Sequence, residues 1–439
     1  MKESRRNYFI GLNNGMLTSV SQSILNPNFV LAAFLYSVTG SAFLVGLLAT
    51  VHFEGMFLPQ LYMSSLIEHQ KRKKPFFIYA LALRIGMLII MILLIFLSSR
   101  IGSIWILYIY IFVFFFYKLF RGAEFIVFWD FFGGAVAPNK LGEFIAYRTL
   151  LSNIAAMVTG ILLIQPIISI YGDSHTSVLI LSLVTFGILL LDLLQLSLVR
   201  EVPNESPPAK RSLRKTAAGG VAAMKESPNY RKLLVLRILH RINMLNFTFL
   251  IPFAVEHLGI IGIAGIFLTI LQVTKFSTSV LWGRVSRRFG NRTVLLSCNI
   301  LFTLGALLVL VSSGVPEIFH LTLRWLPSEL NLPMLIIILA IVTTGAGLTG
   351  NTISFKAFVL ESAPKHRRSS SLAFINTAAA PIALLAPICG FIVEQNPMYF
   401  YFFYVFIAGI GVVSAAVAAS LKEVRHEVPR EAATTGSSG

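Results

Sequence analysis

Charged residues are scarce in this sequence, and acidic residues are the scarcest. Only 13% of the 439 residues are charged, and 19 Asp and Glu stand against 36 Lys and Arg, which gives a formal net charge of +17. About a quarter of the residues in a typical soluble domain are charged. Hydrophobic residues make up 56% of the chain and the mean hydropathy is +0.78. The composition therefore excludes an ordinary soluble globular protein.

Cysteine is nearly absent, and so are the patterns of common catalytic sites. Cys298 and Cys389 both fall in long apolar runs, which argues against a disulfide framework and against a metal site. The chain has no G-x-x-x-x-G-K-[ST] pattern, which argues against direct ATP drive. Because no nucleophile or metal-ligand cluster appears either, we expect no enzyme, no cofactor and no metal.

Long apolar runs fill most of the chain instead. A spanning helix needs roughly 20 mostly apolar residues, because every backbone N–H and C=O in lipid must be bonded within its own segment. We count twelve such runs. Lys and Arg gather in the N-terminal tail, in the loops after even-numbered runs and in the C-terminal tail, with Arg100 and Arg324 on the other side.

This distribution of charge predicts the orientation in the membrane. By the positive-inside rule both termini are cytoplasmic, in a multi-pass protein of the plasma membrane, which in bacteria is the inner membrane. Basic loops that meet an anionic leaflet also explain the net charge, so we expect no nucleic-acid partner.

A short basic turn between two apolar runs carries the clearest motif. Residues 281–296 read LWGRVSRRFGNRTVLL, and Gly283, Gly290 and Arg292 occupy the first, eighth and tenth places of the pattern G-x-x-x-D-R-x-G-R-R. On this motif the chain resembles the major facilitator superfamily, in which the pattern joins the second and third helices of each half. The fifth place, usually Asp, is Arg287 and the sixth is Arg288, so the carboxylate that the family uses to brace this turn is missing here.

A degenerate second copy of the turn lies upstream. In residues 64–73, SSLIEHQKRK, Glu68 takes the Asp place and Arg72 is one of three closing basic residues, while the glycines are gone. Internal repetition is how such transporters are built. By resemblance, both turns are expected to take part in conformational gating.

The resemblance implies an all-helical integral membrane protein whose twelve spans form two pseudo-symmetric six-helix bundles, working by alternating access. We place the N-terminal bundle at 1–199, a cytoplasmic linker at 200–231, the C-terminal bundle at 232–421 and a cytoplasmic tail at 422–439. The first span is expected as one helix over about 8–36, and the fourth to continue to about 132. The antiport signature of the fifth helix is missing, which weakens a drug-exporter interpretation.

Basic residues inside the spans are the candidate substrate site. Lys118 and Arg121 lie in the fourth helix, Arg241 in the seventh and Lys275 in the eighth. Since helices 1, 4, 7 and 10 line the cavity in proteins that this chain resembles, the resemblance implies a basic cavity wall. Such cations would bind carboxylate or phosphate. Alternatively, each cation pairs with a nearby acid and serves packing.

Polar residues of the first and second helices complete the candidate site. Asn14 and Gln22 are expected to face the cavity and contact substrate. Glu54, with His52, is the expected proton-coupling site, because a mid-bilayer carboxyl is costly unless it is protonated or paired. Glu124 is a further proton-coupling candidate, and the alternative for Glu54 is a structural carboxyl bonded to a neighbouring helix.

Five charged residues nearer the cytoplasmic face are expected to be structural, because long side chains there reach water and acids brace basic turns. They are Asp130, Asp192, Arg237, Lys356 and Glu361.

Together these features predict a monomeric secondary transporter that moves a small organic anion or zwitterion, coupled to protons. Its partners are then the small-molecule substrate, protons and the lipid bilayer. Two alternatives stay open. One is an exporter or flippase of an amphiphilic or drug-like compound, which the 36 Phe favour, and the other is a membrane sensor or scaffold that transports nothing.

Overall fold

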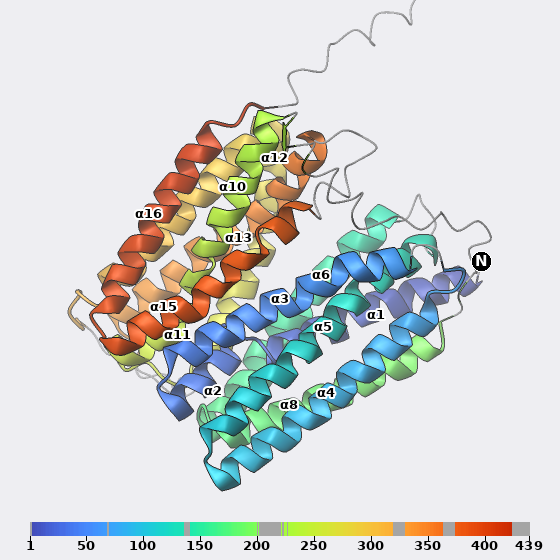
Figure 1. Cartoon of the computed structure of the whole chain (residues 1–439), viewed down its shortest axis with the longest axis horizontal. Coiled ribbons are helices and arrows are strands. Elements are labelled where there is room, and N and C mark those ends of the chain that lie inside the picture. The colour runs from blue at the N-terminus through green and yellow to red at the C-terminus, as the bar shows by residue number, and fades with distance from the viewer. Residues whose placement is uncertain are drawn as a thin grey trace, which may run out of the picture.

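The structure is a computed structural model that describes residues 2–67, 70–135, 141–199, 201, 221, 224–225, 227–318, 330–362 and 374–423. These ranges are folded almost entirely into helices (Figure 1). The N-terminal half contains α1 (Lys2–Ile24), α2 (Val30–Thr39), α3 (Ala42–Ile67), α4 (Lys74–Ile101), α5 (Ile104–Ala135), α6 (Leu141–Thr159), the π-helix η2 (Gly160–Ile164), α7 (Gln165–Tyr171) and α8 (His175–Ser197). The C-terminal half contains α10 (Pro228–Asn243), α11 (Leu245–Leu258), α12 (Ala264–Ser312), α13 (Leu332–Ser362), the 3-10 helix η4 (Ala380–Leu384), α15 (Leu385–Gln395) and α16 (Tyr399–Ala419).

Among the described residues, ten helical stretches are long and apolar enough to cross a membrane. One of them, Ala264–Ser312, is 49 residues long and is divided at Gly290, so it supplies two spans. The pair α1 and α2 supplies one more at the N-terminus. This count reaches the twelve spans expected from the sequence, and the all-helical membrane fold is confirmed.

The first span is broken, which corrects the expectation of one helix over 8–36. The chain leaves α1 at Asn26 and Pro27, and Pro27 has no N–H to continue the helical hydrogen bonds. The Oδ1 atom of Asn26 accepts hydrogen bonds from the backbone N–H groups of Asn28 (3.0 Å) and Phe29 (3.2 Å). These bonds satisfy the backbone at the start of α2, so the break is stabilised.

Two other boundaries bear on the site. The helix α5 continues to Ala135, so Lys118 and Arg121 lie in its middle, as expected. The helix α10 begins at Pro228, where Ser227 caps it by accepting a hydrogen bond from the N–H of Tyr230 (3.3 Å). This helix therefore starts four residues before the predicted linker boundary at 232.

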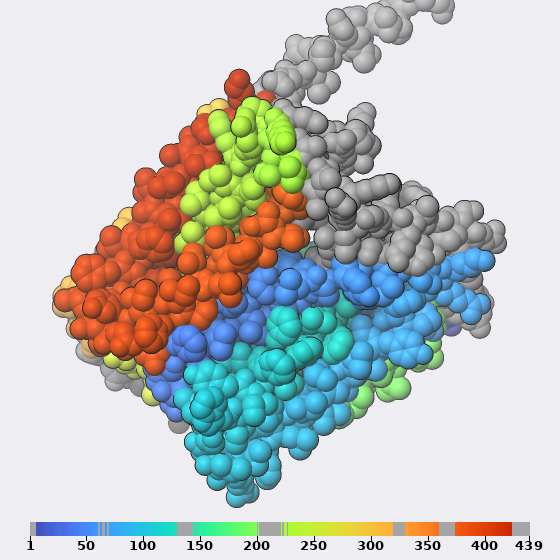
Figure 2. Space-filling view, viewed as in Figure 1, coloured from blue at the N-terminus to red at the C-terminus, as the bar shows by residue number. Residues whose placement is uncertain are grey.

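The helices form two bundles that cross near α2, α3 and α11 (Figure 1). The bundles diverge toward the end of the molecule where α1 begins and α16 ends, which we call the terminus end; the other is the opposite end. In the space-filling view, the last helices of the C-terminal half cover part of α3 (Figure 2).

Small residues let the two halves approach closely toward the opposite end. A Cβ atom on Gly46 of α3 would collide with the backbone of Ala386 on α15, and one on Gly390 would meet the start of α3. Across the molecule, a Cβ atom on Gly160 of η2 would meet the side chain of Thr269 on α12. Close packing through small side chains is a usual means of helix association in membranes.

Three carboxylates add hydrogen bonds to this contact between the halves. Asp173 accepts a hydrogen bond from the N–H of Gly262 (3.0 Å). Glu394 accepts hydrogen bonds from the Ser41 hydroxyl (2.9 Å) and from the N–H of Phe43 (3.0 Å). Glu256 accepts one from the Tyr36 hydroxyl (3.0 Å). Packing and hydrogen bonds together hold the halves against each other at the opposite end.

At the terminus end, the turn after residue 281 is braced by a carboxylate from another part of the chain. Gly290 has φ 86° and ψ 167°, a conformation that L-residues rarely adopt. Glu423, which follows α16, accepts a hydrogen bond from the N–H of Arg292 (3.0 Å), and the Arg292 guanidinium donates to the carbonyl of Ala419. Glu423 thus supplies the carboxylate that Arg287 replaces within the turn.

The first half repeats this brace. Glu201, which follows α8, accepts hydrogen bonds from the N–H groups of Lys73 and Lys74, the latter at 3.1 Å. The Lys74 ammonium donates to the carbonyls of Ser197 (2.6 Å) and Val199 (2.7 Å). In each half, an acid after the sixth span binds the start of the third span.

The other turn residues are placed at the surface. Arg72, Arg287 and Arg288 are exposed, and Gly283 faces open space. Glu68 lies outside the described residues. The proposed role of these turns in conformational gating stays a prediction.

Candidate functional site

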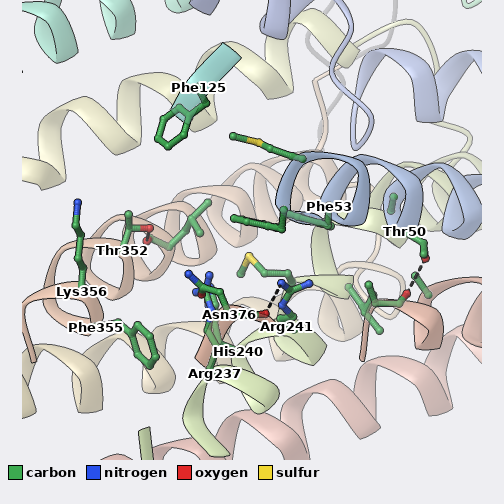
Figure 3. A pocket seen from close by; sticks show the side chains of 18 residues that line it. Thr50, Phe53, Phe125, Arg237, His240, Arg241, Thr352, Phe355, Lys356 and Asn376 are labelled. Atoms are coloured by element: carbon green, nitrogen blue, oxygen red, sulfur yellow. Dashed lines mark hydrogen bonds between the residues drawn. The ribbon is translucent and has the colours of Figure 1, made fainter. Parts of the chain in front are cut away.

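A cavity of about 450 Å³ lies between the two halves (Figure 3). Its walls come from α3 and α5 of the N-terminal half and from α10, α11, α13, η4 and α15 of the other half. The lining residues are Ala49, Thr50, Phe53, Met56, Phe57, Phe125, Arg237, His240, Arg241, Met244, Leu245, Leu348, Thr352, Phe355, Lys356, Asn376, Ala383 and Ala386. Most of them are apolar, and a few polar groups converge among them, as in typical small-molecule sites.

An ion pair joins the two halves at this cavity. Arg241 of α10 donates to the Oε1 atom of Glu54 of α3 at 2.8 Å, and the two side chains are 9% and 14% exposed. A second donor of Arg241 lies 3.4 Å from the carbonyl of Asn376, and its guanidinium lies 5.3 Å from the ring centre of Phe57. The structure therefore brings a predicted substrate residue and a predicted proton-coupling residue into direct contact.

Two more cations line the cavity, Arg237 one turn before Arg241 and Lys356 on α13. The Arg237 guanidinium lies 5.3 Å from the ring centre of Phe355, and its Nε atom is buried without a hydrogen-bond partner. Lys356 is exposed at one end of the cavity, near Thr352 and Phe355 in Figure 3. We expected both cations to be structural, and the structure instead places both in the cavity wall. For Arg237, its spacing from Arg241 on α10 was a usable signal, because residues four apart share one helix face.

The cations of the fourth span lie in a separate buried network inside the N-terminal half. Glu124 of α5 accepts from Arg84 of α4 at 2.9 Å, and Arg121 approaches the same oxygen at 3.5 Å. Arg84 also donates to the hydroxyl of Tyr117 (2.8 Å), while the Lys118 ammonium lies 4.9 Å from the ring centre of Phe114. Arg121 lies one turn before Phe125, which lines the cavity.

A second buried group lies in the same half. Asn14 of α1 donates to both carboxylate oxygens of Asp192 at 3.0 and 2.9 Å and accepts from Arg148 of α6 at 3.0 Å. This network accounts for the buried Asn14 of the first helix. Arg148 is buried deeply enough to take part in it, although the sequence analysis did not single it out.

The remaining candidate residues are dispersed. His52 lies on α3 with its ring 5.1 Å from that of Phe53, Gln22 is partly buried on α1, and Lys275 lies on α12. The cavity lining includes none of these three among the residues that the structure describes. In the same part of the chain, no group of three or more His, Cys, Asp and Glu could hold a metal ion.

Two bundles of membrane-spanning helices with a cavity between them define the fold of a polytopic membrane protein. Residues 233–438 match the model of the Major Facilitator Superfamily. The match covers the C-terminal half of the chain, the half that contains the turn motif after residue 281.

Solved structures with the same fold cover nearly the whole chain. The nucleoside transporter NupG is 13% identical with a TM-score of 0.70, over 94% of this chain and 100% of that one. A bacterial homologue of the iron transporter ferroportin, in its inward-facing state, is 13% identical with a TM-score of 0.69, over 94% and 98%. The E. coli fucose:proton symporter FucP is 13% identical with a TM-score of 0.57, over 95% and 99%. No curated protein matches the chain.

Proposed function

We propose that this protein moves a small organic anion or zwitterion across the membrane by alternating access and that a proton gradient drives the transport. The observation that carries the proposal is the Glu54–Arg241 ion pair, because it links the two halves at the cavity. A guanidinium that holds a carboxylate of the protein can equally hold a carboxylate or phosphate of a substrate. The name of the fucose:proton symporter supports coupling to protons within this fold.

The ion pair suggests how coupling works. A substrate anion that binds Arg241 displaces Glu54, which is left as a carboxylate in a mostly buried place. An unpaired buried charge is costly, and protonation removes that cost. With Glu54 neutral and Arg241 occupied by substrate, the direct link between α3 and α10 is gone and the halves are free to rearrange.

The orientation is also a proposal. We place the terminus end, with its basic turns, in the cytoplasm of a bacterial cell. The exposed Arg72, Arg287 and Arg288 at this end support the placement, because positive charge marks the cytoplasmic side. A membrane-impermeant thiol reagent should then label Cys introduced at Arg72 in inverted vesicles and leave it unlabelled in intact cells.

The first experiment identifies a substrate. The thermal midpoint of purified protein is measured with panels of organic anions, cations, sugars and lysolipids at pH 5.5 and 7.5, since ligands of the folded state raise the midpoint. The stabilising anion is then used, radiolabelled, in proteoliposomes. Wild-type protein should accumulate it when a pH gradient is imposed, and Glu54→Gln should exchange it in counterflow without accumulating it. Accumulation that persists after a protonophore collapses the gradient would contradict proton coupling.

The cavity lining favours one rival, the export or flipping of an amphiphile, because apolar side chains, among them phenylalanine, methionine and leucine, form most of its surface. Stabilisation by lysolipids alone would support that rival. A sensor or scaffold would bind a ligand and show no counterflow.

A further inference from the structure

Arg237 and Lys356 stand in the cavity wall without a compensating acid. Neither forms an ion pair with a carboxylate in the described part of the chain, whereas Arg241 is paired with Glu54. The Arg237 guanidinium is only partly accessible, and its Nε lacks a partner. Buried polar groups without partners are rare in native proteins, and each requires an explanation. A negatively charged ligand would provide the missing partner.

The charges that line the cavity indicate the charge of a ligand that would neutralise it. Its described lining contains three cations and no acid, and Glu54 neutralises one of the cations from beside the cavity. Two positive charges therefore remain, on Arg237 and Lys356. His240, which lies between the two arginines on α10, is buried against the ring of Phe302 at 5.4 Å.

The rest of the wall is flat and apolar. Phe57 and Phe355 each lie against a guanidinium group, and these contacts fix the direction of the two arginines. Phe53 and Phe125 line the cavity from α3 and α5, across from α10. Figure 3 shows Arg237 and Arg241 close together below Phe53, and Lys356 on α13 beyond Thr352 and Phe355.

We propose that the cavity binds an organic anion with a doubly charged head and a flat apolar body, the head held by Arg237 and Lys356 and the body lying against Phe53 and Phe125. This inference rests on the proposed transport of anions and narrows it to one chemical class. It assigns the first contact with the head to Arg237 and Lys356, while Glu54 is still paired with Arg241 and before the anion displaces it. It gives the buried network around Arg121 no direct contact with the head.

Phenyl phosphate is a suitable probe, because a phosphomonoester is close to doubly charged above its second pKa of about 6. Its dissociation constant is measured by calorimetry in detergent at pH 7.5, next to benzoate, which has one charge, and inorganic phosphate, which has no apolar body. Phenyl phosphate should bind at least about ten-fold more tightly than benzoate, since each charged contact is worth about that factor or more. It should also bind more tightly than inorganic phosphate, because only phenyl phosphate buries an apolar ring.

Variants separate the head from the body. Arg237→Gln and Lys356→Gln should each weaken the binding of phenyl phosphate and of inorganic phosphate by about ten-fold or more. Phe53→Ala should weaken the binding of phenyl phosphate and leave that of inorganic phosphate unchanged. Arg231→Gln, which removes an exposed charge from α10 outside the cavity, is the matched control and should change neither. Lys356 is exposed, so its variant tests the head even where Arg237→Gln reduces folding.

The outcomes distinguish this inference from the proposed transport. If benzoate binds as tightly as phenyl phosphate, the cavity does not require a doubly charged head. If binding is unchanged in both charge variants, Arg237 and Lys356 do not hold the head. Either result refutes this inference even where proteoliposomes accumulate an anion. Binding that depends on Arg237 and Lys356, without transport of any anion, supports this inference and contradicts the proposed function.

Discussion

The ion pair between Glu54 and Arg241 makes a quantitative prediction about the conformational equilibrium. The pair is 2.8 Å long and mostly buried, and it ties α3 to α10 in the conformation described here. Removing one partner of a fully buried pair costs about 3–5 kcal/mol. Because these side chains retain some exposure, we expect about 2 kcal/mol, which is roughly a 30-fold change in an equilibrium constant. Glu54→Gln and Arg241→Gln should each shift the population toward the conformation in which the opposite end is open.

The double variant is the decisive measurement. If the two charges act through each other, the shift in Glu54→Gln/Arg241→Gln should be close to that of one single variant, a coupling of about 2 kcal/mol. Spin labels at the exposed positions Ile170 and Met398, at the opposite end of the two halves, report the population by electron resonance. The native Cys298 and Cys389 are first replaced by Ser. Shifts of the two single variants that add in the double variant would refute a direct link.

Three further predictions concern the turns and the contact between the halves. Gly290→Ala forces a side chain into a left-handed conformation and against Glu423, so thermal stability should fall, by about 2 kcal/mol, and a midpoint equal to wild type contradicts the strained turn. Gly46→Leu should keep the two halves apart at the opposite end, because its side chain would collide with the backbone of Ala386. The distance between the spin labels should lengthen and counterflow should be abolished. Burial raises the pKa of the Asp173 carboxyl above its ordinary 3.8, against the opposing hydrogen bond from Gly262. The folded state then holds a proton that the unfolded chain has lost, so stability should fall as pH rises from 3.8 through the raised value. This part of the fall should be absent in Asp173→Asn.

The sequence was sufficient for the fold because the relevant signals are long or repeated. Apolar runs of spanning length predict membrane helices whatever their partners, and a turn motif after residue 281 with a weaker copy upstream indicated two similar halves. The break after Ile24 was missed, because a proline within an apolar run can kink a spanning helix without ending it. Here the side chain of Asn26 makes the interruption stable, which depends on local geometry.

The site was harder to predict because burial and pairing are properties of packing. Arg241 and Glu54 were both identified from their depth in the membrane, but their contact joins residues 187 apart in sequence. Lys118 and Arg121 were identified on the same ground, and the structure buries both inside one bundle. Arg237 was expected to be structural because it lies nearer the cytoplasmic face, although its position one turn from Arg241 placed it on the same face of the helix.

The paired braces at Glu201 and Glu423 have a practical consequence for handling the protein. Each of these glutamates lies where the chain leaves a bundle. The stability of the turn that each one braces therefore depends on where a truncation or fusion is made. A chain shortened after Glu423 keeps the bond to the N–H of Arg292, whereas one shortened after Leu421 loses it. Affinity tags and reporter domains are therefore best joined beyond residue 423, and a split between the two halves is best made after Glu201.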